Sequence, residues 1–238
     1  MSSHKYDLAP PGDALMRITR TEHELEAAVG AASCLANRLT ELVDLQGQAS
    51  VAFSGGKTPQ VMFDELARMD VPWQAVHVFQ VDERVAPDGD PDRNWTGLTQ
   101  GLLEPAGIPR SHRHAIPVTS FTPEAAASEY GRTISMIAGQ RIDVIHLGLG
   151  DDGHTASWPP GDAAVISAAA DVASINSFRG FPRVTLTPRM VNRADAIVWL
   201  VTGTDKSAAL SSLANHDGAV PAAAVRESDS DMFTSIPV

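Results

Sequence analysis

The chain has 238 residues, of which 43% are hydrophobic and 20% are charged, a balance typical of soluble globular proteins and unlike that of disordered chains. Eighteen Lys and Arg residues against 29 Asp and Glu residues give a formal net charge of −11, which disfavours nucleic acid and anionic membranes as partners, since both attract Lys and Arg. A site for an anionic ligand would therefore need the few basic side chains to be gathered in one place.

The cysteine content and the N-terminal region predict a cytoplasmic protein. Cys34 is the only cysteine, so no internal disulfide can form, and its apolar position in a predicted helix indicates an inert core thiol. Residues 1–13 are polar and proline-rich, without the apolar core of a signal peptide, and are expected to be a flexible tail. No apolar run approaches the roughly 18 residues that a membrane span requires.

Strand-like and helix-like segments alternate along the chain. In chain order they are a helix over 21–45, a strand over 48–53, a helix over 58–69, a strand over 75–81, a helix over 94–103, a helix over 122–139, strands over 142–150, 171–176 and 183–187, a short helix over 188–194, a strand over 195–203 and a helix over 205–214. This alternation predicts a single α/β domain over 1–238, Rossmann-like and doubly wound, with a mostly parallel sheet and helices on both faces.

Three helix starts have recognisable signals. Thr21 and Glu24 fit a capping box. Thr58 and Thr122 each precede a proline, the pattern of an N-cap followed by the first helical position. Ligands of such folds bind beyond the carboxyl ends of the strands, so the loops that follow strands are the places to search for function.

The loop "SGGKTP" follows the strand over 48–53 and predicts an anion site. Gly55 and Gly56 let the backbone approach an oxyanion closely, and the N-terminus of the next helix adds its positive dipole end. Ser54 and Thr58 flank these glycines, whereas Lys57 either contributes or is solvated. The spacing is not that of a Walker loop, and a plain tight turn is the structural alternative.

Charged residues at the ends of other predicted strands fit an anionic ligand. In "DERVAP", Arg84 could bind a carboxylate, a phosphate or a developing oxyanion while Asp82 orients it, although a solvated loop is the alternative. Arg183 begins the strand over 183–187, and Lys206 lies at a helix N-terminus. Either alone could be a surface charge, but in an acidic protein their positions favour a phosphate clamp.

The segment "GLGDDGHTASWPPG" can be read as a dinucleotide fingerprint or as a catalytic loop. The fingerprint is disfavoured because the prolines at 159–160 arrive too soon for the required helix, and the acidic pair at 151–152 would face the pyrophosphate. What remains is Asp152 and His154 in a glycine-rich loop at a strand end. A histidine beside a carboxylate is suited to act as a general base on water.

Two other chemistries were weighed and are disfavoured. A metal centre is not expected, because there is one close His–Asp pair, no H-E-x-x-H and no cysteine set. His112 and His114 are expected in an exposed linker, where a weak metal site stays open. A nucleophilic serine is not expected either, because neither Ser54 nor Ser157 lies in a G-x-S-x-G elbow.

Five motifs taken in order, "SGGKTP", "VDERV…DRNW", "LGLGDDGHTAS", "RVTLT" and "VTGTDKSAAL", resemble those of the 6-phosphogluconolactonases, over about residues 16–225. That family shares a superfamily with the glucosamine-6-phosphate isomerase/deaminases. The resemblance implies a doubly wound α/β fold and cofactor-free hydrolysis of 6-phospho-D-glucono-1,5-lactone, a small sugar-phosphate lactone, to 6-phosphogluconate in the oxidative pentose phosphate pathway. The oligomeric state stays open between a monomer and a small homo-oligomer.

Matched motif by motif, the resemblance also implies roles for single residues. His154 takes the place of the base that activates water, with Asp152 in the same motif, and Asp82 and Arg84 lie near the lactone. The phosphate would be bound by Ser54, Gly55, Gly56 and Thr58 and closed in by Arg183 and Lys206, with Asn94 at a further polar position.

Two alternatives and three departures accompany the resemblance. Deaminases resemble "GHIAFNEP", in which a glutamate follows the histidine, whereas here no acid occurs before Asp162. A non-catalytic sugar-phosphate sensor is disfavoured because His154 is present and no basic helix-turn-helix segment precedes the fold.

Lactonases usually read "GHTASLFPG", so Trp158 is expected to reshape the loop. Arg93 replaces a common serine, and the C-terminal segment lacks a clear closing helix.

Overall fold

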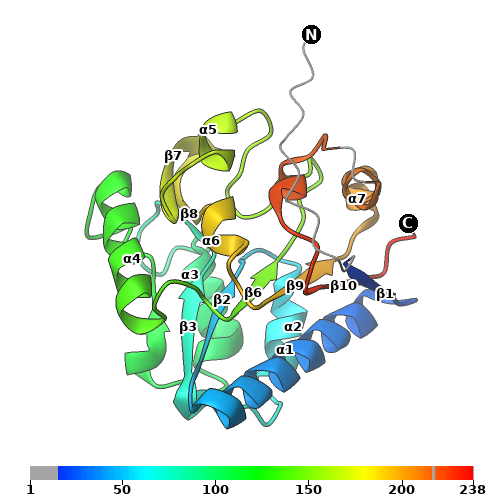
Figure 1. Ribbon diagram of the computed structural model, residues 1–238, viewed down its shortest axis with the longest axis horizontal. Coiled ribbons are helices and arrows are strands. Elements are labelled where there is room, and N and C mark those ends of the chain that lie inside the picture. Colours follow the sequence, from blue (N-terminus) through cyan, green and yellow to red (C-terminus); the bar gives the residue numbers. More distant parts are fainter. Residues whose placement is uncertain (1–15, 216–217, 238) are drawn as a thin grey trace.

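A parallel sheet of seven strands forms the centre of the structure, a computed structural model that describes residues 16–215 and 218–237 (Figure 1). The predicted tail over 1–13 lies outside these residues. The strand order is β1-β10-β9-β6-β2-β3-β5, and every neighbouring pair is parallel. The strands are β1 (Arg17–Arg20), β2 (Ala49–Phe53), β3 (Val76–Gln80), β5 (Arg113–His114), β6 (Val144–Leu147), β9 (Ala196–Val201) and β10 (Ser230–Thr234).

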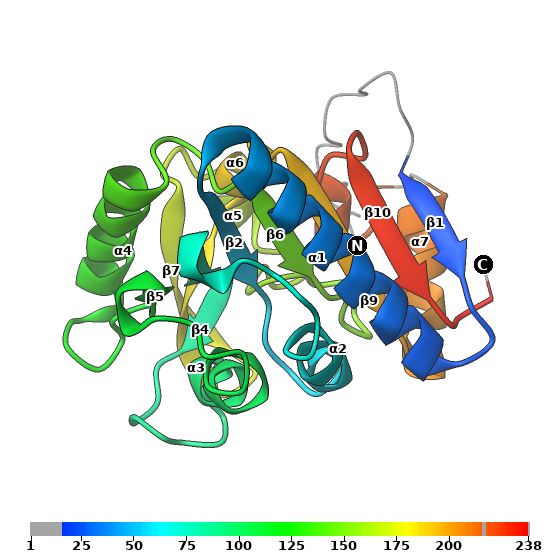
Figure 2. The same cartoon turned by 90° about the horizontal axis from the view of Figure 1, so that it is seen from below.

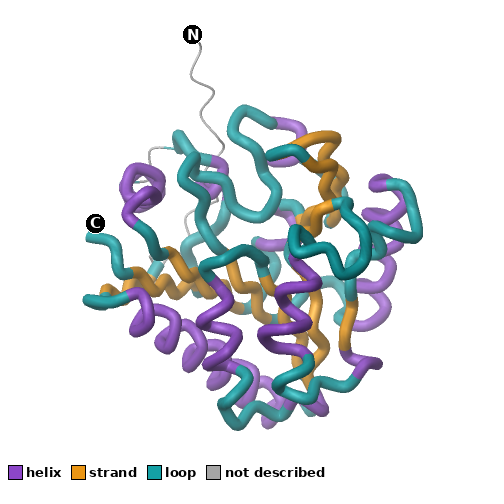
Figure 3. Tube along the Cα trace, turned by 180° about the vertical axis from the view of Figure 1, so that it is seen from behind, coloured by secondary structure: helices purple, strands orange, loops and turns teal. Residues whose placement is uncertain are grey.

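Helices cover both faces of this sheet (Figures 1 and 3). One face packs against α1 (Glu24–Gln46), α2 (Pro59–Leu66), α3 (Asn94–Leu98) and the π-helical turn η2 (Thr99–Leu103), and Figure 2 shows α1 lying across the strands. The other face packs against α4 (Pro123–Ile137), α6 (Pro188–Val191) and α7 (Ser207–Ala214). The remaining helices are α5 (Ala163–Ile166) and the 3₁₀ turns η1 (Trp73–Ala75), η3 (Arg110–His112), η4 (Thr204–Lys206) and η5 (Pro221–Ala224).

Alternate strand residues supply the two halves of the core. In β2, Val51 and Phe53 belong to the cluster under α1 and α2, whereas Ala52 belongs to the cluster on the opposite face. In β9, Val198 and Leu200 likewise belong to the cluster under α1 and α2, whereas their neighbours in the strand belong to the cluster on the opposite face. Strands covered on both faces are expected to be apolar at nearly every position. The predicted doubly wound, mostly parallel fold with helices on both faces is thus confirmed.

A second, antiparallel sheet was not predicted. It has the order β4-β8-β7 and consists of β4 (Asp82–Arg84), β7 (Val172–Phe178) and β8 (Phe181–Leu186). The prediction of a loop at "DER" is therefore wrong for these three residues, because Asp82 pairs with Thr185 and Arg84 with Arg183. A pairing between segments a hundred residues apart leaves no local signal in so short a run.

The point where the chain changes direction across the sheet lies between β2 and β6. From β2 the chain crosses to β3 on one side, and from β6 it proceeds to β9 on the other, although β2 and β6 are neighbours. In open α/β sheets a crevice forms at the carboxyl ends of two strands with this arrangement. The loops that follow β2 and β6 are "SGGKTP" and "GLGDDGHTAS".

Three local expectations have different outcomes, and only the first is corrected. The capping box of α1 uses His23 and Glu26, not Thr21 and Glu24: the Glu26 carboxylate accepts from the His23 N–H at 3.4 Å. The C-terminal segment forms β10, a strand between β1 and β9. By contrast, the N-cap at Thr122 is confirmed, since its hydroxyl accepts a hydrogen bond from the Ala125 N–H.

Cys34 and the linker histidines also have defined surroundings. Cys34 is half-buried, and desolvation raises the pKa of its thiol, in keeping with an unreactive side chain. His112 and His114 are not exposed as predicted but half-buried against His77, whose Nδ1 lies 3.0 Å from His114 Nε2. No helix in the described part of the chain combines the length and apolar character needed to cross a membrane.

Candidate active site

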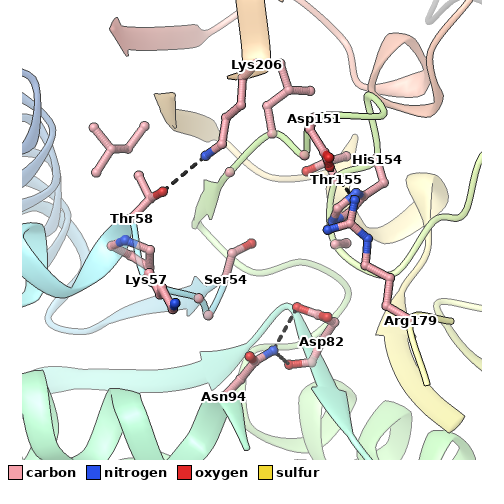
Figure 4. A pocket seen from close by; sticks show the side chains of 18 of the residues that line it. Ser54, Lys57, Thr58, Asp82, Asn94, Asp151, His154, Thr155, Arg179 and Lys206 are labelled. Carbon is pink, nitrogen blue, oxygen red and sulfur yellow. Dashed lines mark hydrogen bonds and ion pairs between the residues drawn. The ribbon is translucent and has the colours of Figure 1, made fainter. Parts of the chain in front are cut away.

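A cavity of about 280 Å³ opens at the carboxyl ends of β2, β6 and β9, where the small sheet meets the main one (Figure 4). Ten of the eleven predicted site residues line it, namely Ser54, Gly55, Gly56, Thr58, Asp82, Arg84, Asn94, His154, Arg183 and Lys206. The eleventh, Asp152, contacts His154 from outside the lining. The structure therefore brings together residues that are distant in the sequence.

The "SGGKTP" loop forms one wall of the cavity. A Cβ added at Gly55 would lie 2.2 Å from Asn94 Oδ1, so only glycine permits Asn94 to approach this closely. The Ser54 N–H donates to the His146 carbonyl at 3.2 Å, which fixes the loop to the end of β6. The Ser54 hydroxyl is buried and has no hydrogen-bond partner within the described residues, so it is available to a ligand.

Thr58 has a different role from the one predicted. It occupies the predicted N-cap position before Pro59, but its backbone is already helical and its side chain makes no capping hydrogen bond. Its hydroxyl instead accepts a hydrogen bond from Lys206 Nζ at 3.1 Å. Burial lowers the pKa of the Lys206 ammonium, because desolvation disfavours the charged form. The N-terminal end of α2 and one lysine thus lie side by side at this end of the cavity.

Asp82 is held in one orientation on the floor of the cavity. Ser157 Oγ donates to Asp82 Oδ2 at 2.6 Å, and Asn94 Nδ2 donates to the Asp82 carbonyl at 3.0 Å. Arg183 Nη1 lies 3.7 Å from Asp82 Oδ2, and its guanidinium stacks over the Phe178 ring at 5.2 Å. Burial lowers the pKa of Arg183, against the opposing effect of Asp82. The carboxylate therefore connects three separate segments.

Glu83 and Arg93 stabilise the segment that carries Arg84. The fully buried Glu83 carboxylate accepts from Gln80, from Arg93 Nε at 3.1 Å and from the N–H groups of Arg84, Asn94 and Trp95. Arg93, the departure from the usual serine, also pairs with Asp88 at 2.6 Å. The Arg84 side chain donates to the Asp92 carbonyl at 2.7 Å, while its Nε has no partner among the described residues.

The loop after β6 places a histidine against a carboxylate. His154 Nδ1 lies 2.5 Å from Asp152 Oδ1, and the His154 N–H donates to the same oxygen at 3.1 Å. Partial burial raises the pKa of Asp152, but the two hydrogen bonds from His154 outweigh it and the pKa falls below its usual value. Because an ionised carboxylate only accepts, Nδ1 carries the proton and Nε2 is left free to accept one.

Glycine in this loop leaves room for the loop to fold back on itself. A Cβ at Gly150 would lie 2.0 Å from His154 Nδ1, and the Gly150 N–H donates to the His154 carbonyl at 2.8 Å. No helix begins at Gly153, since α5 starts only at Ala163. The arrangement differs from a dinucleotide-binding turn, which requires a helix at that point.

Trp158 anchors the same loop to the core. Its ring is fully buried, and its Nε1 donates to the Leu186 carbonyl of β8 at 2.8 Å. Ser157 and Trp158 together tie the end of the loop to both β4 and β8. The replacement expected to reshape the loop therefore supplies an attachment to the small sheet.

Arg179 is the main site residue that the sequence reading missed. It projects from the hairpin between β7 and β8, lines the cavity and pairs with Asp151, and its Nη2 lies 3.2 Å from Asp152 Oδ2. Figure 4 shows Asp151, His154 and Arg179 together, across the cavity from Lys206 and Thr58. The available signal was Gly180, between two predicted strands.

Positive charge is concentrated in the cavity. Five basic side chains line it, Lys57, Arg84, Arg179, Arg183 and Lys206, against three acidic ones, Asp82, Asp151 and Asp205. This local excess contrasts with the net charge of −11 for the whole chain. The cavity therefore suits an anionic ligand, because the basic side chains of its walls attract negative charge that the acidic surface of the protein repels.

Three donor groups in the cavity are close enough for a metal ion. The ligand atoms of Asp151, Asp152 and His154 lie within 4.8 Å of one another. However, the Arg179 guanidinium already bridges the two carboxylates, and His154 Nδ1 is bonded to Asp152. The two carboxylates are therefore already paired with a guanidinium, and a metal ion would have to displace the Arg179 side chain to bind here.

Fold and site together define an α/β protein with an anion-binding cavity at the switch point of its sheet. The description "glucosamine-6-phosphate isomerases/6-phosphogluconolactonase" belongs to the family model that matches residues 21–234, and the chain is a member of this family. The resemblance inferred from the five motifs is confirmed.

Curated relatives and solved structures agree with this assignment. A 6-phosphogluconolactonase of Synechocystis is 36% identical over 183 residues, 74% of this chain and 76% of that protein. One from Mesorhizobium japonicum is 35% identical over 207 residues, covering 82% and 81% of the two chains. The structure of a 6-phosphogluconolactonase from Thermotoga maritima matches with a TM-score of 0.84 at 27% identity, over 92% of this chain and 98% of that one. A monomeric glucosamine-6-phosphate deaminase, at 18% identity and a TM-score of 0.79, shares the fold.

Proposed function

We propose that this protein hydrolyses 6-phospho-D-glucono-1,5-lactone to 6-phosphogluconate, with His154 as the base that activates water. The observation that carries the proposal is the Asp152–His154 pair facing a cavity whose opposite end is formed by the "SGGKTP" loop and Lys206. The relatives named 6-phosphogluconolactonase, two of them 35–36% identical over most of their length, support the same activity.

Substrate binding is proposed to begin at the phosphate. The backbone of Ser54, Gly55 and Gly56, the N-terminal end of α2 and the Thr58 hydroxyl supply hydrogen bonds, while Lys206 and Arg183 supply charge. Binding energy from this remote group orients the lactone carbonyl for reaction. Asn94, through its contact with Asp82, fixes the floor beneath the sugar ring.

The chemical step is a water attack on the activated ester. His154 Nε2 takes a proton from water as its oxygen bonds to the lactone carbonyl carbon, and Asp152 stabilises the resulting imidazolium through Nδ1. Arg84, whose side chain donates to the Asp92 carbonyl, stabilises the oxyanion. When the ring C–O bond breaks, the imidazolium returns the proton to the departing oxygen. No covalent enzyme intermediate is needed.

The deaminase alternative fits the loop less well. The family members with that activity resemble a pattern with a glutamate shortly after the histidine, whereas residues 155–157 here carry no acid. The first acid, Asp162, accepts hydrogen bonds from the N–H groups of Ala164 and Val165 and so caps α5. It is engaged outside the cavity lining, which favours hydrolysis over deamination.

The test is a direct comparison of substrates with the wild-type protein. Freshly made 6-phosphogluconolactone should be consumed with release of one proton per turnover, and glucosamine 6-phosphate should release no ammonia. Ammonia release without lactone hydrolysis would establish the deaminase. Binding of 6-phosphogluconate without turnover of either compound would establish a sensor.

We further propose that the protein acts in the cytoplasm on small molecules alone, as a monomer or a small homo-oligomer. The single cysteine fits a reducing compartment. The net charge of −11 disfavours binding to the negatively charged backbone of nucleic acids. Light scattering of the purified protein and a nucleic-acid binding assay at low salt would check it.

A further inference from the structure

Arg179 has a backbone conformation that its residue type disfavours. It occupies the first position of a two-residue turn, closed by the Phe178–Phe181 pair, that joins β7 to β8. Arg179 has φ 49° and Gly180 has φ 86°. Two-residue turns in which both residues have positive φ favour Asn-Gly. Asparagine tolerates the left-handed region because its short polar side chain can hydrogen-bond to the local backbone, whereas arginine has no such compensation. Strain of this kind persists where surrounding contacts enforce it, commonly at functional sites.

The contacts of Arg179 lead to the catalytic loop. Its guanidinium pairs with Asp151, and its Nη2 reaches Asp152 Oδ2 at 3.2 Å. It also lies over the Phe178 ring at 5.7 Å, and the edge of that ring packs against His154 with centroids 5.0 Å apart. The hairpin tip is thereby fixed to the loop that carries the base (Figure 4).

These contacts divide the Asp152 carboxylate between two partners. Oδ1 accepts from His154 Nδ1, and Oδ2 accepts from Arg179. A carboxylate held at both oxygens cannot rotate away from the imidazole. Arg183 contacts the same Phe178 ring as Arg179, so the hairpin tip is packed from two sides.

We propose that Arg179 is a positioning residue that fixes the Asp152 carboxylate against His154, the proposed base. The inference rests on the proposed lactonase function and adds to it a residue that acts through Asp152. Its charge is engaged by the two carboxylates, so it contributes little to binding the substrate phosphate.

The test uses Arg179→Asn, which removes the charge and creates the turn sequence that this hairpin favours. We expect its melting temperature to equal or exceed that of the wild type. The plateau kcat should fall about threefold to tenfold, because Asp152 is less firmly oriented, while KM changes less than threefold.

Two further variants make the result specific. Arg179→Lys keeps a cationic donor at the tip and should restore most of the kcat that Arg179→Asn loses. Arg189→Gln is the matched control, since Arg189 is similarly exposed (56% against 47% for Arg179), pairs with Asp171 at 3.2 Å and lies outside the cavity lining. It should change neither kcat nor KM.

An unchanged kcat in Arg179→Asn would overturn the inference, whatever the stability of the variant. A rise in KM with no fall in kcat would also overturn it and assign Arg179 to phosphate binding. Failure of the wild type to hydrolyse the lactone would instead overturn the proposed function itself.

Discussion

Ser157 Oγ donates a 2.6 Å hydrogen bond to Asp82 Oδ2, and this buried bond joins the catalytic loop to the first strand of the small sheet. Ser157→Ala would remove the donor and leave that oxygen with the 3.7 Å contact to Arg183. We expect a loss of about 1–3 kcal/mol in the free energy of unfolding, because a buried acceptor goes unsatisfied, together with a lower kcat/KM. Urea denaturation at pH 7 measures the first effect.

Ser167→Ala is the control for that experiment. The Ser167 hydroxyl donates to the Ala163 carbonyl on the exposed side of α5, so its removal should cost less than about 0.5 kcal/mol. Equal losses in the free energy of unfolding of the two variants would show that the buried Ser157–Asp82 hydrogen bond stabilises the fold no more than an exposed one.

Trp158→Leu, which restores the residue usual in the family pattern, should destabilise this particular protein. The change leaves a cavity where the buried ring packs and removes the donor to the Leu186 carbonyl. Together these effects should cost about 2–4 kcal/mol. Trp158→Phe keeps most of the volume and loses only the hydrogen bond, so it should cost about half as much. Thermal unfolding of the three proteins gives the order, and an equally stable Leu variant would refute the anchoring role.

Lys206 should give substrate binding an alkaline limit. Because burial lowers its pKa, the ammonium loses its proton at a lower pH than an exposed lysine would, and phosphate affinity should fall as pH rises towards that value. Lys206→Met should weaken 6-phosphogluconate binding about tenfold to a hundredfold at pH 7 and remove its alkaline dependence. Calorimetric titrations from pH 7 to 10 make the measurement. Wild-type affinity that stays constant over this range would contradict the assignment.

His146 should make the fold sensitive to acid. It is 1% exposed, neither ring nitrogen has a partner among the described residues, and desolvation lowers its pKa to about 3. The folded state therefore binds fewer protons than the unfolded state between pH 3 and about 6.5, so stability falls as the pH drops through that window. Between pH 7 and 5 the loss due to this one group should be about 2 kcal/mol.

His146→Leu removes that titration and the unsatisfied polar group together. The variant should be at least as stable as the wild type at pH 7 and should lose about 2 kcal/mol less between pH 7 and pH 5. His114, whose pKa is lowered to about 4 mainly by desolvation, contributes the same to both proteins and cancels in the comparison. Identical losses in the two proteins would show that His146 is protonated at little cost in the folded state.

Much of the architecture was predictable because each element carries a local pattern. The strands over 49–53 and 196–201 are apolar at every position except Ser50, which is the pattern of strands covered on both faces, and a loop that contains glycine follows each. The helix at Pro123–Ile137 begins at a threonine and a proline, as expected. The grouping of site residues from the "SGGKTP" and "GLGDDGHTAS" loops around one cavity was predictable from the positions of these loops after strands, whereas Asn94 and Arg183 were placed only by the resemblance to the family.

The rest depended on contacts that no local pattern contains. The strand at Asp82–Arg84 exists only through its pairing with β8. The Thr58 hydroxyl makes no capping hydrogen bond and instead accepts one from Lys206, which lies 148 positions away in the sequence. Arg179 is prominent only when the β7–β8 hairpin is seen to reach the catalytic loop.

The most direct measurement is hydrolysis of freshly prepared 6-phosphogluconolactone by the wild type and by His154→Ala, with 6-phosphogluconate binding measured in parallel. If His154 is the base, the kcat of the variant should fall by about 10²–10⁴-fold, towards the spontaneous rate. The dissociation constant should stay within about threefold, because the "SGGKTP" loop and Lys206 are untouched. Turnover by His154→Ala equal to that of the wild type would contradict the account.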